Sequence, residues 1–183
     1  YLLRALEKEK NFDVLALSRS FREDEKFLPS DLNKKSNIKW LQCDLFSLLD
    51  LEKALDQADY AIYLVHSMLP TSKLVQAEFQ DNDLIIADNF ARTAKEKGVK
   101  QIIYLGGIIP PGKDLSLHLK SRLETEDTLR NYGVPVTSLR AGIIIGKGGS
   151  SFNILKKLVE RLPVMILPSW TQNASKPVAI EDV

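Results

Sequence analysis

The sequence has little of what marks several large classes of protein. Cys43 is its single cysteine, which excludes an internal disulfide and a metal site built from several cysteines. The longest apolar runs, such as AGIIIG, are far too short to span a bilayer. Lysine and arginine total 25 against 24 acidic residues, and without a basic tract nucleic-acid binding is not indicated. We therefore expect a cytoplasmic protein that binds no metal, no nucleic acid and no membrane.

What the sequence has is an alternation of strand-like and helix-like segments. The strand-like segments are continuously apolar, which predicts a parallel sheet with helices on both faces. The expected strands are residues 12–20, 37–46, 59–68, 99–107, 134–146 and 177–183, and the expected helices are residues 1–11, 48–58, 72–98, 116–133 and 151–163. The order predicts an α/β, Rossmann-like, doubly wound fold.

The ends of several helices carry recognisable signals. Gly98 and Gly133 stand where the third and fourth helices are expected to end, as glycine often does at a helix C-terminus. Pro163 stops the last helix, and Asp50 is a candidate N-cap of the second.

The chain opens inside a helix, although the first strand of a doubly wound fold is central in the order 3-2-1-4-5-6. We therefore expect residues 1–183 to form a single Rossmann-like domain, of the kind that binds dinucleotides, which is incomplete at both ends. The first strand and its phosphate-binding glycine loop would precede Tyr1, and residues 147–183 would begin a smaller, substrate-side region. GIIIGKGGS does not replace that loop, because four residues do not separate a glycine from the Gly-Lys pair.

Several segments, taken in order, resemble the atypical short-chain dehydrogenase/reductases. They are CDLFSLLDLEKALDQADYAIYLVHSM, QIIYLGGIIP, HLKSRLETEDTLRNYGVPVTSLRAGIIIG, LPVMILPSW and KPVAIEDV. The branch they resemble is the NmrA-like, NAD(P)H-binding proteins, also described as sugar-nucleotide epimerase-like. The resemblance covers essentially the whole chain and implies a dinucleotide cofactor, but it does not identify a substrate.

The resemblance places cofactor contacts at the ends of the first strands. Arg19 stands where NAD-specific relatives have an acidic residue, so it favours NADP over NAD, unless it is an ordinary surface arginine. Asp44 and Leu45 would lie beside the adenine ring, unless they only form a turn.

The next two strand ends would face the nicotinamide half of the cofactor. Leu64, Val65 and His66 end one of these strands, and His66 is either a functional group or a structural histidine. Gly106 and Gly107 end the other, where active relatives usually have a serine or threonine. Glycine permits close approach of a ligand to the backbone but supplies no hydroxyl.

The family's Tyr-x-x-x-Lys motif falls on HLKSR, so His118 holds the tyrosine position and Arg122 the lysine position. The following LETE, which ends in a glutamate, sets this register. Four-residue spacing puts both side chains on one helix face. Arg122 would lower the pKa of His118 and favour a neutral imidazole able to exchange a proton. The alternative is an ordinary solvated helix face.

Asp83 lies on the apolar stripe of the long helix. A buried carboxylate there needs a partner, for which His66 and Arg122 are candidates, whereas the alternative leaves Asp83 exposed near the helix start.

Three functions compete at this point. The first is an NADP-dependent oxidoreductase, or an epimerase-like enzyme, acting on a small carbonyl, quinone or sugar-type substrate, with His118 or His66 as proton donor. The second is a non-catalytic NmrA-like dinucleotide sensor that acts through a protein partner. The third is a scaffold, because fold alone does not fix function. The sequence gives no indication of an oligomeric state.

Overall fold

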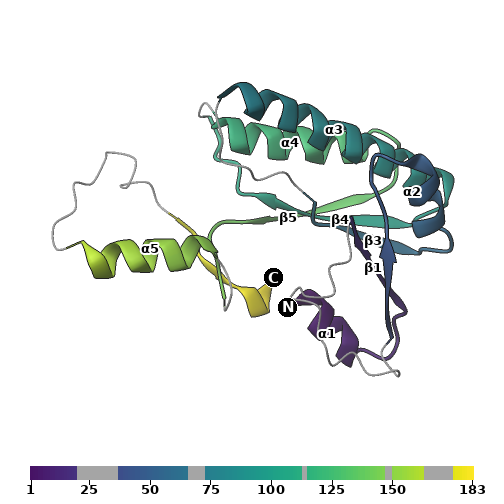
Figure 1. Ribbon diagram of the computed structural model, residues 1–183, viewed down its shortest axis with the longest axis horizontal. Coiled ribbons are helices and arrows are strands. Elements are labelled where there is room, and N and C mark those ends of the chain that lie inside the picture. The colour runs from purple at the N-terminus through teal and green to yellow at the C-terminus, as the bar shows by residue number, and fades with distance from the viewer. Residues whose placement is uncertain (20–36, 66–72, 113–114, 147–149, 163–174) are drawn as a thin grey trace.

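The computed structural model describes residues 1–19, 37–65, 73–112, 115–146, 150–162 and 175–183 (Figure 1). The helices are α1 (Leu2–Lys8), α2 (Leu48–Ala54), α3 (Lys73–Glu96), α4 (Leu117–Arg130) and α5 (Ser150–Arg161), with a 3₁₀ helix η2 (Ile180–Asp182). The strands are β1 (Val14–Ser18), β2 (Ile38–Gln42), β3 (Tyr60–Tyr63), β4 (Gln101–Gly107), β5 (Val136–Ala141), β6 (Ile144–Ile145) and β7 (Val178–Ala179). In the described part of the chain no helix is long and apolar enough to cross a membrane.

Every strand pair that the structure describes is parallel, which confirms the predicted fold class. β1 pairs with β2, and β3, β4 and β5 form a second sheet in that order. The two sheets reproduce the doubly wound order 3-2-1-4-5-6 with the place of its first strand left between β1 and β3. Because the strands within each sheet are parallel, their carboxyl ends lie at one edge of that sheet.

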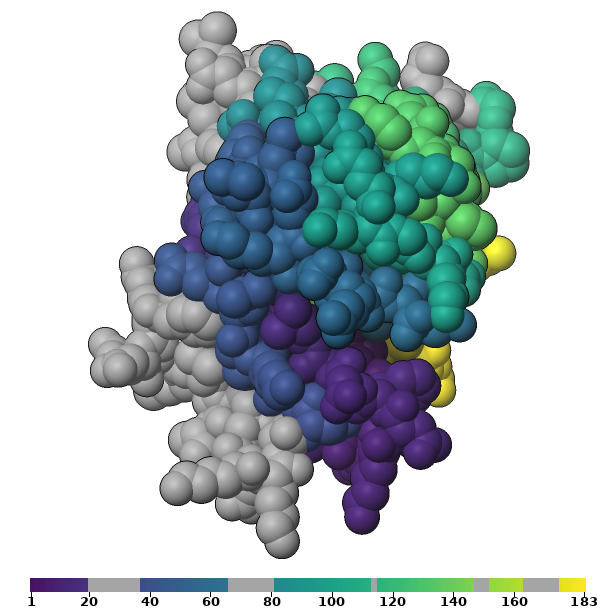
Figure 2. Space-filling view, turned by 90° about the vertical axis from the view of Figure 1, so that its right-hand side faces the viewer, coloured from purple at the N-terminus to yellow at the C-terminus, as the bar shows by residue number. Residues whose placement is uncertain are grey.

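The core lies between these strands and the helices α2, α3 and α4, which cover one face (Figure 1). β3 shows the division, because Ala61 and Tyr63 are buried whereas Tyr60 and Ile62 are 59% and 40% exposed. α1 lies on the other side of the strands, where the side-chain amide of Asn37 contacts the carbonyl oxygen of Leu6 at 3.1 Å. Figure 2 shows the purple N-terminal residues below the blue residues of β2 and α2.

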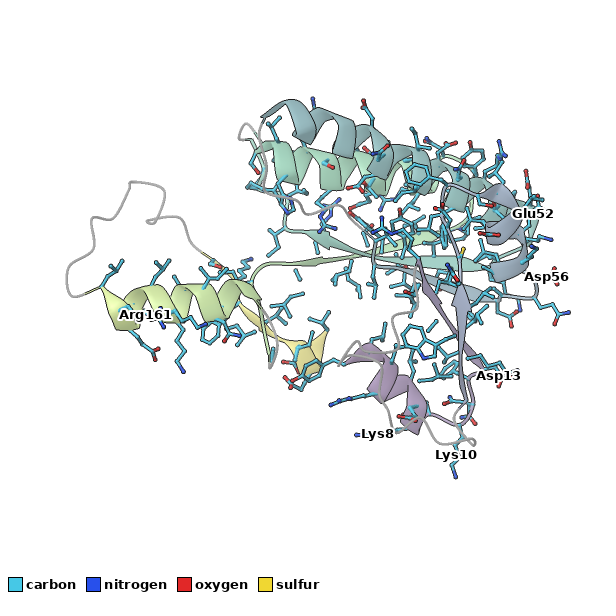
Figure 3. The ribbon with its side chains drawn as sticks, in the orientation of Figure 1. Lys8, Lys10, Asp13, Glu52, Asp56 and Arg161 are labelled. Carbon is cyan, nitrogen blue, oxygen red and sulfur yellow. The ribbon has the colours of Figure 1, made fainter. Side chains whose placement is uncertain are left out.

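The helix ends follow the sequence signals in two of the three places that the structure describes, and Pro163, the fourth signal, lies outside the described residues. Gly98 and Gly133 adopt φ of 75° and 77°, the left-handed conformation that glycine accepts readily, just after α3 and α4. The cap of α2 is Ser47, not Asp50 as predicted: the Ser47 hydroxyl accepts from the Asp50 amide at 3.3 Å. Ser47 is the N-cap because it directly precedes the helix, whereas Asp50 lies in the first turn of the helix. At the far end of α2, Asp56 pairs with Lys97 at 3.5 Å (Figure 3).

Two of the predicted strands each divide into two elements. Residues 134–146 form β5 and then β6, with a break at Gly142, where an added Cβ would collide with the carbonyl oxygen of Lys176. Residues 177–183 form the short strand β7 and then η2, because the partner strand β6 has only two residues.

β6, β7, η2 and α5 extend away from the main body (Figure 1). That residues 147–183 begin a smaller, substrate-side region stays a prediction. Five large apolar side chains at the α5 end are 45–61% exposed, namely Ile154, Leu155, Leu158, Val159 and Leu162.

Candidate functional site

A cavity of about 390 Å³ opens at the carboxyl edge of β4 and β5 and beside the start of α4. Its lining comes from β3, β4, α4 and the β5–β6 segment: Leu64, Leu105, Gly106, Gly107, Ile108, His118, Leu119, Arg122, Ala141, Gly142 and Ile144. In doubly wound proteins, ligands bind at this edge of the sheet. The cavity is therefore the candidate site.

The first turns of α4 place His118 and Arg122 in this cavity. The hydroxyl of Ser116 accepts from the Leu119 amide at 3.3 Å and caps the helix directly before His118. Because the two residues are four apart on a helix, their side chains share one face. Both residues of the predicted pair line the cavity, and His118 is at the same time exposed. That the pair faces a ligand stays a prediction.

The electrostatics of the pair follow from partial burial and from charge. Desolvation lowers the pKa of His118 below its usual 6.5, and the positive charge of Arg122 lowers it further. His118 is therefore mostly neutral at pH 7, with one ring nitrogen that donates and one that accepts.

Gly106 and Gly107 bring bare backbone to the cavity, as their place at the end of β4 predicted. A Cβ on Gly106 would lie 3.0 Å from the Cε1 atom of Tyr104, and one on Gly107 would lie 2.9 Å from Leu119 Cδ2. Neighbouring side chains thus occupy the space in which the family's serine or threonine would begin.

Two buried tyrosines, Tyr63 and Tyr104, lie behind the cavity lining near Gly106 and Arg122. The hydroxyl of Tyr104 donates to the carbonyl oxygen of Arg122 at 3.2 Å, and its ring lies 6.2 Å from that of Tyr63. Burial raises the pKa of both phenols, although Arg122 partly offsets this for each. Both hydroxyls therefore stay protonated at neutral pH and act as fixed packing and hydrogen-bonding groups, not as acids.

Asp83 lies near the same two tyrosines. It is only 7% exposed, so the alternative of an exposed carboxylate near the helix start is wrong. Its charge acts on the phenols of Tyr63 and Tyr104, and so does the charge of Arg122. Asp83 thus contributes negative charge to the surroundings of the arginine that lines the cavity.

A buried carboxylate fixes α4 against β5. Glu126 is 2% exposed and meets Arg130 at 2.6 Å and Arg140 at 2.8 Å. Burial acts to raise the pKa of Glu126, but hydrogen bonds from Arg140, Arg130 and Ser138 outweigh it and hold the pKa below the usual 4.5. The network holds the helix that carries His118 and Arg122.

Of the predicted site residues, five line the cavity together: Leu64, Gly106, Gly107, His118 and Arg122. Val65 directly follows Leu64 at the same strand end and is 39% exposed. His66 lies outside the described residues. Sequence reasoning missed the wall formed by Ala141, Gly142 and Ile144, which the rule that ligands meet strand carboxyl ends would have found at the end of β5.

The remaining predicted residues lie at the ends of β1 and β2. The exposed Arg19 accepts at its carbonyl oxygen from the side-chain amide of Gln42, 3.2 Å away. A carboxylate oxygen of Asp44 accepts from the Phe46 amide at 3.1 Å, whereas Leu45 packs against the core. These residues belong to the β1–β2 sheet and do not line the cavity.

Sequence comparisons find one relative among the curated proteins. No protein-family model matches the chain. The Auxiliary protein GraX of Staphylococcus aureus is 33% identical over 109 residues, which are 57% of this chain and 31% of that protein.

Two solved structures illustrate the likeness in fold. DesIV, a dTDP-glucose 4,6-dehydratase of Streptomyces venezuelae solved with NAD, gives a TM-score of 0.72 at 13% identity over 99% of this chain and 63% of its own. The triphenylmethane reductase of a Citrobacter species, solved with NADP(H), gives a TM-score of 0.50 at 18% identity over 67% of this chain and 39% of its own. The resemblance to the atypical short-chain dehydrogenase/reductases is thereby confirmed at the level of the fold. The chain spans less than two-thirds of each of these three proteins.

Proposed function

Because the chain shares its fold with NAD- and NADP(H)-binding proteins, we propose that it belongs to an NADP-dependent reductase of small carbonyl compounds. One observation carries the proposal: an imidazole, a guanidinium and a bare glycine backbone share one cavity at the carboxyl edge of a parallel sheet. These are the positions that hold tyrosine, lysine and a hydroxyl residue in the family that the sequence resembles.

The residues at this edge fit a dinucleotide. Leu64 and Val65 are 46% and 39% exposed at a strand end, which suits apolar side chains that a ligand covers. The exposed guanidinium of Arg19 suits a 2′-phosphate, and Asp44 and Leu45 lie where an adenine ring would. A strand with a glycine-rich loop, seated between β1 and β3, would complete the site.

The protein's own groups would then position the reactants. Bound NADPH supplies a hydride. Arg122 donates hydrogen bonds to the cofactor ribose or to the substrate oxygen, and His118 holds a proton beside that oxygen. His66, which lies outside the described residues, is the second candidate proton donor.

The test is a titration of the full-length protein with NADPH and NADH, followed by nicotinamide fluorescence. We expect NADPH to bind more tightly and Arg19→Glu to weaken NADPH by roughly tenfold while sparing NADH. Arg161→Glu on α5 is the control, because Arg161 lies far from this edge (Figure 3). Binding of neither nucleotide would refute the proposal and leave a scaffold role.

A second candidate is a dinucleotide-binding regulator that acts through a protein partner. Two observations favour it: the family's Tyr, Lys and hydroxyl residue are all replaced, and the Staphylococcus relative is described as an auxiliary protein. NADPH binding without oxidation of bound NADPH by any tested carbonyl compound would support the regulator over the reductase.

A further inference from the structure

The walls of the cavity are chemically uneven. Among its described lining residues, His118 and Arg122 are the polar side chains, and both come from α4. The other lining residues are glycine or carry apolar side chains: Leu64, Leu105, Gly106, Gly107, Ile108, Leu119, Ala141, Gly142 and Ile144. The cavity thus has one polar end and an apolar remainder.

This composition discriminates between the substrate classes that the fold accommodates. A sugar ring carries hydroxyls around its circumference, and each needs a partner when water is removed. The described walls of this cavity offer no Asn, Gln, Asp, Glu, Ser or Thr side chain for that purpose. An apolar ring, in contrast, loses nothing at such walls and gains from burial.

The polar end suits a single oxygen acceptor. Arg122 offers the planar donor fork of a guanidinium, and the mainly neutral His118 adds a ring N–H. The cavity volume of about 390 Å³ is near the lower end of the range for small-molecule sites, about 300–1,000 Å³.

We propose that the cavity binds apolar ketones or aldehydes, with the carbonyl oxygen toward His118 and Arg122 and the hydrocarbon part between Leu64, Leu105 and Leu119. Because the described walls offer a sugar ring few side-chain partners, we expect sugar nucleotides not to bind in this cavity. This inference rests on the proposed function, which it narrows to one class of substrate.

Saturation-transfer NMR on the full-length protein tests it with three probes: 1-tetralone, tetralin and UDP-glucose. We expect tetralone to bind, tetralin to bind roughly tenfold more weakly because it lacks the oxygen, and UDP-glucose to give no signal from the cavity. Leu64→Asn should weaken tetralone at least several-fold. Leu155→Asn on α5 should not, and the two wild-type leucines are similarly exposed, at 46% and 48%.

Tetralone binding that is equal in Leu64→Asn and Leu155→Asn, or absent from the wild type, would overturn the inference. So would a UDP-glucose signal that Leu64→Asn removes, or displacement of tetralone by NADPH. Nucleotide binding to the same samples separates the two ideas. NADPH binding without tetralone binding refutes only the substrate class, and tetralone binding without NADPH binding refutes only the reductase.

Discussion

At the scale of single residues, the charge of His118 decides which hydrogen bonds the cavity offers. Its pKa is lowered, so the folded protein binds this proton less readily than the unfolded chain does. Between the usual value of 6.5 and the lowered one, falling pH therefore removes stability, and above 6.5 the effect vanishes.

We expect an NMR titration of the full-length protein to give His118 a midpoint below 6.5, with the signal assigned by its loss in His118→Gln. Arg122→Met should raise the midpoint only partway, because burial is the larger cause. Lys120→Met is the control, since that ammonium pairs with Glu124 at 3.7 Å. A midpoint that Arg122→Met leaves unchanged would contradict the electrostatic coupling.

Gly107 and Leu119 should be energetically coupled, because a Cβ on Gly107 would approach Leu119 Cδ2 to 2.9 Å. We expect Gly107→Ala to be more favourable in the Leu119→Ala background than in the wild type by about 1 kcal/mol. Urea unfolding of the four proteins gives this coupling energy, and additive effects would show that Leu119 simply moves aside.

At the scale of elements, α4 depends on Glu126 for its attachment to β5. Glu126→Gln should lower the free energy of unfolding by about 2 kcal/mol, because it removes hydrogen bonds to a buried charge. Since the pKa of Glu126 is lowered, this stabilisation is present above the usual 4.5 and is lost as pH falls through the lowered value.

Chemical denaturation at neutral and at acidic pH checks this prediction. Glu124→Gln on the same helix is the matched control, because its pair with Lys120 is exposed and its loss should change stability by less than about 0.5 kcal/mol. Equal losses in the two variants would mean that burial of Glu126 adds nothing.

The sequence predicted elements wherever the signal is local. Gly98 and Gly133 mark helix ends through a conformation that each residue adopts by itself, and the His118–Arg122 face follows from helix geometry alone. The break between β5 and β6 at Gly142 was missed because it depends on the close approach of the Lys176 backbone. Lys176 is distant in the sequence, and the pattern of apolar residues around Gly142 carries no information about it. The cavity wall formed by Ala141, Gly142 and Ile144 is predictable in part, because Ala141 ends β5 and ligands meet strand carboxyl ends, whereas the position of Ile144 depends on how β6 is placed.

At the scale of the whole molecule, the backbone indicates how the place between β1 and β3 would be filled. The backbone N–H of Val14 donates to the carbonyl oxygen of Asn37, so the backbone N–H and C=O groups of Val14 and Ala16 point toward β2. Those of Leu15 and Leu17 point away from β2. The backbone N–H of Lys100 donates to the carbonyl oxygen of Asp59, which therefore points toward β4. By the same alternation, the backbone groups of Ala61 point toward β4 and those of Ile62 point away from it.

If a strand occupies that place in the full-length protein, the amides of Leu17 and Ile62 should exchange with deuterium as slowly as those of Ala16 and Ala61. Hydrogen exchange resolved by NMR gives the four rates. Exchange at Leu17 and Ile62 that is faster by orders of magnitude would show that no strand pairs there, and the dinucleotide proposal would lose its glycine loop.

The two buried tyrosines near the cavity have a practical consequence. Tyr63 sits edge-on to Phe90, with ring centroids 5.0 Å apart, and the ring of Tyr104 lies so near Gly106 that a Cβ there would be 3.0 Å from it. Aromatic rings held rigidly in an asymmetric setting absorb left and right circularly polarised light differently. The protein therefore carries its own optical reporter, and near-ultraviolet circular dichroism should register any ligand that shifts the backbone at Gly106, with no label attached.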